Sequence, residues 1–207
     1  FGLILAVFLA KKTRLNGLLQ SVAFSPYIVS LASIALLWMW LMNNDFGFLN
    51  ALLAVFGIPA IDWLGSPKFA LMSLIIINVW KSVGYNALIL VSALQGIPPH
   101  LYEAARLDRA NTWRTFSRIT FPMISPTVFF LALVDVIAAF KVFETIQIIT
   151  QGGPQNSTNT LVFSLYEYGF QFYKVGYAAA IGVVLFFIVL LFTILYFAVL
   201  SKRVHYQ

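Results

Sequence analysis

The sequence has no cysteine, only two histidines, and few charged residues, which make up 10% of its 207 positions. The absence of cysteine excludes disulfides and thiolate metal sites, so the redox compartment is not indicated. A soluble domain carries about 25% charged residues. Because 61% of the residues are hydrophobic, a chain of this length cannot bury its apolar surface in its own core. The excess is predicted to face lipid.

Groups that carry out chemistry are equally scarce. The histidines, His100 and His205, stand far apart, and the sequence shows no cluster of nucleophilic, acid/base or metal-ligating residues. The glycine pair Gly152-Gly153 is followed by Pro154 and does not form a phosphate-binding loop. We therefore predict that the chain is not an enzyme, binds no metal or cofactor itself and does not hydrolyse ATP.

Four long apolar runs are predicted to cross a bilayer as helices. Each exceeds the roughly 20 residues that a spanning helix needs. A helix is favoured because its backbone groups satisfy one another without water. The runs are Gln20 to Met42, Phe69 to Leu94, Met123 to Ile149, and Val175 to Leu200.

The first ten residues are also apolar and run directly into Lys11-Lys12. They supply about half the length of a span. We expect the tail of a span whose start is absent, which gives five spans, the first one partial, of an expected six. The alternative is a short buried N-terminal segment. In either case residues 1–207 are predicted to form one membrane domain.

The basic residues indicate the orientation. Only Lys68 and Lys174 fall in the loops of one face, whereas nine fall on the other, which by the positive-inside rule is cytoplasmic. The net charge of +6 is thus explained by topology and anionic lipid rather than by nucleic acid. The nine residues are Lys11, Lys12, Arg14, Arg106, Arg109, Arg114, Arg118, Lys202 and Arg203.

The outer loops look different. Residues 43–67 are rich in glycine and proline and contain Trp63, which is predicted to anchor the loop at the membrane interface. Residues 161–173 are rich in aromatic side chains and are expected to lie along the outer interface.

The cytoplasmic loop 95–121 contains a predicted short helix. Pro98 and Pro99 end the preceding span, because proline interrupts the helical hydrogen-bond ladder. Good helix formers then run to Asp108. With Glu103 and Arg106 on one face, such a helix is suited to docking in a groove of a partner. The alternative is a solvated amphipathic loop.

The residues of this loop resemble the EAA signature of binding-protein-dependent importers of the ATP-binding-cassette class. That signature runs Glu-Ala-Ala, Asp-Gly-Ala, Phe, Ile and Leu-Pro. The segments IPPHLYEAA and TQGGP and the end of the chain resemble the carbohydrate branch, related to the maltose and glycerol-3-phosphate permeases. The matching residues are Glu103-Ala104-Ala105, Asp108-Arg109-Ala110, Phe116, Ile119 and Phe121-Pro122.

The resemblance implies an all-α polytopic membrane protein with the type I importer fold, in a bacterial inner (plasma) membrane. It implies a permease subunit for a sugar or a related polyol such as glycerol 3-phosphate. Its partners would be a second permease subunit, an extracytoplasmic solute-binding protein and two cytoplasmic ATP-binding subunits, which use the ATP and Mg. Coupling to the ATPase would fall to Glu103, Ala104, Ala105, Asp108, Arg109 and Ala110.

Arg109 departs from the signature, which has glycine there. Glycine is usual where a helix ends in a left-handed residue, and another residue there costs on the order of 1 kcal/mol. Three interpretations are open at this point: the turn stays helical, the arginine adds a salt bridge to the ATPase, or coupling is poor.

Two charges fall near the bilayer centre. Lys81 and Asp135 are each the thirteenth residue of antiparallel runs, where a charge costs roughly 2.5–3.5 kcal/mol. They either form an ion pair or line the pathway; an unpaired lysine would favour an anionic substrate and a paired one a neutral sugar. Lys141 and Glu144 are expected to pair locally. Resemblance to the maltose permease adds Asn78, Trp80 and Tyr85 as substrate-pathway candidates beside Lys81 and Asp135.

Two other transport classes are alternatives to this interpretation. An ion-gradient-driven secondary transporter would have internal repeats and broken helices, and the sequence predicts neither. An amino-acid or peptide importer is disfavoured by the TQGGP segment, through the resemblance alone.

Overall fold

The computed structural model describes residues 1–200, and every regular element in that range is a helix. The chain divides into two compact units that alternate along the sequence. Within the described residues, unit 1 comprises residues 1–27, 82–137 and 191–200, and unit 2 comprises residues 28–81 and 138–190. The all-α prediction is confirmed for this range, the single-domain assignment stays a prediction, and Lys202, Arg203 and His205 lie outside the described residues.

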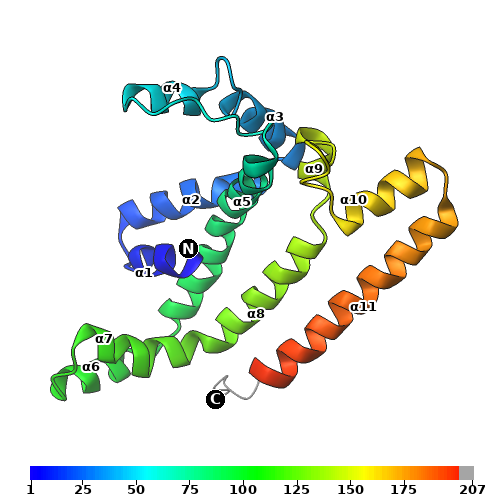
Figure 1. The fold of residues 1–207 in the computed structure, drawn as a ribbon. Helices are drawn as coiled ribbons and strands as arrows, with labels where there is room; N and C mark the ends of the chain where they lie inside the picture. Colours follow the sequence, from blue (N-terminus) through cyan, green and yellow to red (C-terminus); the bar gives the residue numbers. More distant parts are fainter. Residues whose placement is uncertain (201–207) are drawn as a thin grey trace. The chain divides into compact units, whose positions relative to one another are not determined.

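The α-helices are labelled in Figure 1. Two further elements, η1 and η2, are short π-helical turns that continue an α-helix. The bounds are α1 Gly2–Leu9, α2 Arg14–Ile28, α3 Leu31–Leu41, α4 Phe48–Val55, α5 Pro67–Gln95, α6 Pro99–Leu107, α7 Thr112–Thr115, η1 Phe116–Thr120, α8 Phe121–Phe140, α9 Glu144–Ile149, α10 Leu161–Tyr166, η2 Glu167–Gln171 and α11 Val175–Leu200.

Three stretches of helix are long and apolar enough to cross a membrane, and a fourth is possible if the bent pair α2–α3 counts as one span. The three are Pro67–Gln95, Thr112–Ile149 and Val175–Val199. They cover the last three predicted runs to within one residue. The runs Phe69 to Leu94 and Val175 to Leu200 are confirmed as continuous helices, whereas the run Met123 to Ile149 is interrupted at residues 141–143, between α8 and α9. The first ten residues form only the eight-residue α1.

The run from Gln20 to Met42 was wrongly predicted as one continuous helix. It is divided into α2 and α3, which are bent by 99° at the break. Pro26 lies inside α2 near its end, and Ser30 before α3 adopts an extended backbone with ψ 135°. Apolar composition reports how long a segment is but not where its direction changes, so the break was not visible in the hydropathy.

Serine side chains repair the helices where proline interrupts them. Proline has no N–H and leaves the carbonyl four residues earlier without its helical donor. Pro26 leaves the Val22 carbonyl without a backbone donor, and the Ser25 hydroxyl donates to this carbonyl at 2.9 Å. Ser125 does the same beside Pro126, donating to the Pro122 carbonyl at 2.8 Å. Two Ser-Pro pairs therefore satisfy the backbone inside apolar helices.

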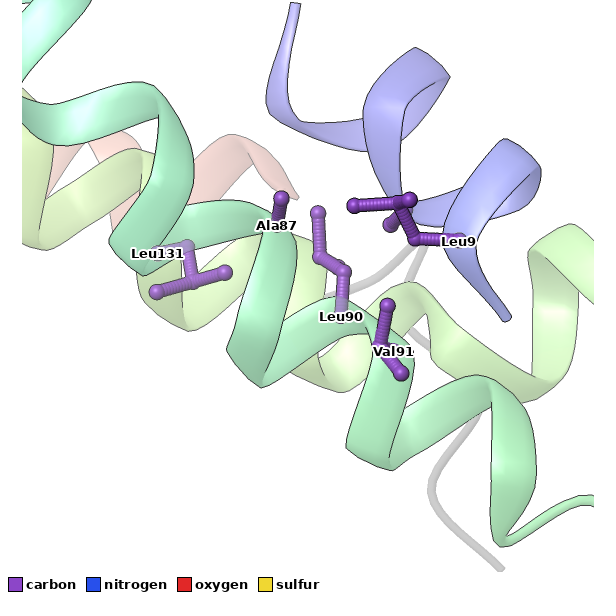
Figure 2. Packing of buried hydrophobic residues seen from close by; sticks show 6 residues of the cluster. Leu9, Ala87, Leu90, Val91 and Leu131 are labelled. Carbon is purple, nitrogen blue, oxygen red and sulfur yellow. The ribbon is translucent and has the colours of Figure 1, made fainter. Parts of the chain in front are cut away.

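Unit 1 has its core where α1, the second half of α5 and α8 meet. Leu9 comes from α1, Leu90 and Val91 from α5, and Leu131 from α8 (Figure 2). The helices α2 and α5 also approach closely, because a Cβ on Gly84 would collide with the carbonyl oxygen of Ala23. Glycine at this position allows close backbone packing, as is common between membrane helices.

The last helix is fixed to α8 by a buried polar contact. The Tyr196 hydroxyl of α11 donates to the Phe129 carbonyl at 2.8 Å, and the two aromatic rings lie 4.7 Å apart. The hydroxyl thus finds a partner where no water is expected to reach. Most other large side chains of α11 are exposed, as expected of a helix that faces lipid or a partner subunit.

Unit 2 is built around α3, α9 and the first half of α5. Ile34 and Met42 pack on Ile77, and Leu74 packs on Ile146. The outer loop contains α4, whose buried Asn50 accepts hydrogen bonds from Trp63 Nε1 at 2.9 Å and from the backbone N–H of Ile61 at 3.1 Å. Trp63 is therefore held by the loop itself; its role as a membrane-interface anchor stays a prediction.

Candidate functional site

The helix α6 presents the signature residues on a fixed support. Pro99 occupies its first position, where a missing N–H costs nothing. Ala105 is buried, and the Tyr102 hydroxyl lies 3.2 Å from the Thr120 hydroxyl, so one face packs on unit 1. The opposite face is exposed, and it carries Glu103, Ala104, Leu107 and Asp108.

Arg109 ends α6 in the left-handed conformation, with φ +52°. The Ala110 N–H donates to the Ala105 carbonyl at 2.9 Å and the Arg109 N–H to the Arg106 carbonyl at 3.0 Å. These two bonds form the Schellman motif, which normally has glycine at the Arg109 position. The turn therefore does not stay helical, which removes the first of the three interpretations. Arg109 therefore adopts the left-handed backbone conformation that favours glycine, at a cost in conformational free energy.

The segment after α6 adds apolar surface that the sequence analysis did not single out. Asn111 caps α7 by accepting from the Arg114 N–H at 2.8 Å. Trp113 is 74% exposed and Leu107 is 85% exposed. Large apolar side chains this open to water are typical of interaction surfaces. The presence of Trp113 within a charged loop was the sequence signal that could have predicted this apolar surface.

Lys81 has a role that neither sequence interpretation foresaw. Its Nζ donates to the Val29 carbonyl at 2.9 Å. Val29 lies between α2 and α3, where the helix break leaves carbonyls without helical donors, and a cation is favourable at such an end. Glu144 of the same unit also interacts electrostatically with Lys81. The lysine thus stabilises the break in unit 2.

Asp135 is paired within unit 1. The Asn86 Nδ2 donates to its carboxylate at 2.6 Å, while the Asn86 Oδ1 is buried and without a hydrogen-bond partner. Both side chains line a cavity of about 170 Å³ beside Gly2. Asp135 itself is exposed, so the carboxylate is both fixed in direction and accessible. The Lys81–Asp135 ion pair stays a prediction, since the two residues belong to different units.

The other pathway candidates differ in how far their side chains are available. Asn78 is occupied within unit 2, donating to the Leu74 carbonyl at 2.8 Å and accepting from Thr145 at 3.3 Å. Trp80 is 37% exposed and meets Trp38 edge-on. Tyr85 stacks on Tyr27 in unit 1, with ring centroids 4.3 Å apart.

The local pair expected between Lys141 and Glu144 is not formed on one helical face. Helix α8 ends at Phe140 and α9 begins at Glu144, so the spacing of three does not place the two side chains on adjacent turns. Like the break after α2, this interruption lies within a run whose composition is uniformly apolar.

We expect Arg109→Gly to raise the stability of the protein by about 1 kcal/mol, because glycine adopts positive φ without steric cost. The matched exchange Arg106→Gly, within α6, should lower stability by roughly 1 kcal/mol. Thermal unfolding of the full-length protein in detergent measures both. If Arg109→Gly destabilises as much as Arg106→Gly, the left-handed assignment is wrong.

The sequence matches a known protein family and several of its characterised members. Residues 1–206 match the family described as "Binding-protein-dependent transport system inner membrane component". The trehalose/maltose transport system permease protein MalF of Thermococcus litoralis is 33% identical over 96% of this chain and 67% of its own length. The sn-glycerol-3-phosphate transport system permease protein UgpA of Pectobacterium atrosepticum is 36% identical over 100% of this chain and 72% of its own.

Two solved structures of ABC transporters have a fold similar to that of this chain. A bacterial alginate ABC transporter in complex with an alginate-pentasaccharide-bound periplasmic protein matches with a TM-score of 0.88 at 24% identity, over 98% of this chain and 71% of its own. A second structure, of an importer of the acidic polysaccharide alginate, matches with a TM-score of 0.84 at 25% identity, over 96% of this chain and 72% of its own. The chain therefore belongs to the inner membrane components of binding-protein-dependent transport systems, as the EAA residues predicted.

Proposed function

We propose that this chain is the permease subunit of an ATP-driven importer, that it lines the pathway of a sugar or related polyol, and that α6 couples it to a cytoplasmic ATPase. The observation that carries the proposal is the exposed face of α6. This face carries Glu103, Ala104 and Asp108. The helix begins at Pro99 and ends in the Schellman motif at Arg109.

The surface of α6 is suited to docking. The Tyr102–Thr120 contact and the buried Ala105 hold the helix against unit 1, so its exposed face is presented with little loss of entropy on binding. Leu107 and Trp113 supply apolar area, and Glu103 and Asp108 supply charges that fix the register of a partner. Arg109 is exposed beside them and is available to a carboxylate of the ATPase.

The complete transporter would contain a second permease subunit, two ATP-binding subunits that use ATP and Mg, and an extracytoplasmic solute-binding protein. The family description names dependence on a binding protein, and the similar alginate transporter was solved with one bound. The exposed apolar side chains of α11 offer surface for lipid and for the second permease. The location is the inner membrane of a bacterial cell.

The substrate is proposed to be a neutral sugar or polyol. The similar permeases are named for trehalose/maltose and sn-glycerol-3-phosphate. Trp80 offers an exposed indole for an apolar sugar face and Asp135 an accessible carboxylate for hydroxyl groups. Lys81 is engaged with the Val29 carbonyl, which favours a neutral sugar over a phosphate ester.

The break between α2 and α3 bears on the rival ion-driven transporter. Broken helices are a feature of that class, and the expectation that this chain has none was wrong. Membership of a binding-protein-dependent family nevertheless supports the ATP-driven importer. Proline and an apolar environment explain the break without invoking an ion site.

Glu103→Lys should abolish sugar uptake while leaving insertion into the membrane unchanged, because it reverses a charge at the proposed ATPase contact. Uptake of labelled sugar by cells that carry the full-length protein and its partners measures this, with quantification of the protein in membranes. Asp45→Lys, an exposed reversal in the outer loop, is the matched control and should transport normally. Normal uptake by Glu103→Lys would disprove the coupling role.

Asp135→Asn should lower uptake per molecule by at least roughly tenfold, the value of one charge-assisted hydrogen bond of about 1.5 kcal/mol. The amide oxygen can still accept from Asn86, so recovery of the assembled complex should not change. Uptake and complex yield are measured together over a panel of neutral sugars and glycerol 3-phosphate. A loss of complex with unchanged uptake per molecule would show a structural role instead.

A further inference from the structure

A cavity of about 570 Å³ lies in unit 1 behind α6, away from the exposed face proposed to dock the ATPase. Its wall is formed by residues from the ends of α1 and α5 and from α6, α7 and η1. The lining residues are Val7, Ala10, Lys11, Leu94, Tyr102, Arg106, Ala110, Thr112, Thr115, Phe116 and Thr120.

The lining combines two kinds of side chain. Lys11 and Arg106 are cationic, and the hydroxyl-bearing Tyr102 and three threonines lie beside them. Val7, Leu94 and Phe116 are apolar, and the first two belong to the apolar helices α1 and α5. No carboxylate is among the residues that line the cavity. Such a site fits a ligand with an anionic head and an apolar tail.

Lys11 is held at the cavity by the way α1 ends. The last carbonyls of a helix need donors, and three side-chain amides supply them. Gln20 Nε2 donates to the Leu9 carbonyl at 2.9 Å and Gln95 Nε2 to the Ala10 carbonyl at 3.2 Å. Asn16 Nδ2 donates to the Lys11 carbonyl at 2.8 Å. The Lys11 ammonium is therefore not needed as a cap.

The two cations are also not neutralised by protein. Among residues 1–200 neither the Lys11 ammonium nor the Arg106 guanidinium has an ion-pair or hydrogen-bond partner. Arg106 lies four positions after Tyr102 on α6, so both side chains share the face that lines the cavity. Two like charges beside one cavity with no acid between them favour binding of an anion.

We propose that this cavity binds the phosphate headgroup of an anionic phospholipid from the cytoplasmic leaflet. Lys11 and Arg106 contact the phosphate, threonine hydroxyls donate to its remaining oxygens, and an acyl chain lies along Val7 and Leu94. Basic pockets on the cytoplasmic side of membrane helices are suited to such headgroups. A free phosphate ion would share the polar contacts but would leave the apolar wall unused.

Lipid bound here would connect α6 to α1 and α5. Arg106 and Tyr102 belong to the helix proposed to meet the ATPase, so an occupied cavity braces that helix from behind. The binding itself does not rest on the proposed function, whereas its effect on coupling does. A test of binding therefore fails or succeeds independently of the transport assignment.

The experiment is a titration of the full-length protein, purified in neutral detergent, with phosphatidylglycerol, followed by native mass spectrometry. K11Q/R106Q should weaken binding on the order of 30-fold, at about 1 kcal/mol per basic residue. K12Q/R14Q removes two charges close to Lys11 in the sequence, at exposed positions that do not line the cavity, and should change binding less than about threefold. K11R/R106K keeps the charges and should retain binding.

Four results would overturn the proposal. Equal losses in K11Q/R106Q and K12Q/R14Q would show general attraction of the basic loop for lipid. Equal binding of phosphatidylcholine and phosphatidylglycerol would remove the need for the cations. Displacement of the lipid by millimolar inorganic phosphate, with phosphate retained instead, would show a free-anion site. Unfolding temperatures in lipid-free detergent confirm that the variants are folded, and loss of binding in K11R/R106K would also contradict the assignment.

Discussion

The structure depends on one constraint: inside lipid, every backbone N–H and C=O must find its partner within the protein. Uninterrupted helices meet it by themselves, and at three interruptions here a side chain meets it instead. Ser25 and Ser125 satisfy carbonyls freed by proline, and Lys81 satisfies the Val29 carbonyl at the break between α2 and α3. A charge in the middle of an apolar run is thus explained by backbone chemistry before substrate is considered.

The same requirement shapes the water-facing end of unit 1. Side-chain amides close the end of α1, and the Schellman motif at Arg109 closes the end of α6. These two helix ends fix the docking face of α6 on one side and the cavity with Lys11 and Arg106 on the other. A single short helix therefore has one surface for the proposed ATPase and another for the proposed lipid. The proposal of an ATPase surface rests on family membership, whereas the proposal of a lipid surface rests on the charge and shape of the cavity.

Length and composition predicted the apolar helices α5 and α11, because both properties are summed over many residues and tolerate local error. The EAA residues predicted the family for a similar reason, since their spacing extends over a whole loop. The break after α2 could not be predicted, because hydropathy carries no direction. The hydrogen-bond acceptor of Lys81 lies 52 positions away at that break. The role of the lysine could therefore not be predicted without knowing where the break is. The left-handed Arg109 was anticipated only as one of three choices, since its side chain does not reveal its φ.

The central claim, that α6 carries the ATPase contact, is tested most directly by site-specific cross-linking. Residues 1–207 contain no cysteine, so Ala104→Cys on the exposed face of α6 and Ala60→Cys in the outer loop introduce unique thiols in this part of the chain. With a short bifunctional reagent in membranes that hold the assembled transporter, the account predicts that Ala104→Cys captures the ATPase subunit, that the yield changes with ATP, and that Ala60→Cys captures none. Capture of the ATPase from Ala60→Cys, or from neither position, would contradict it.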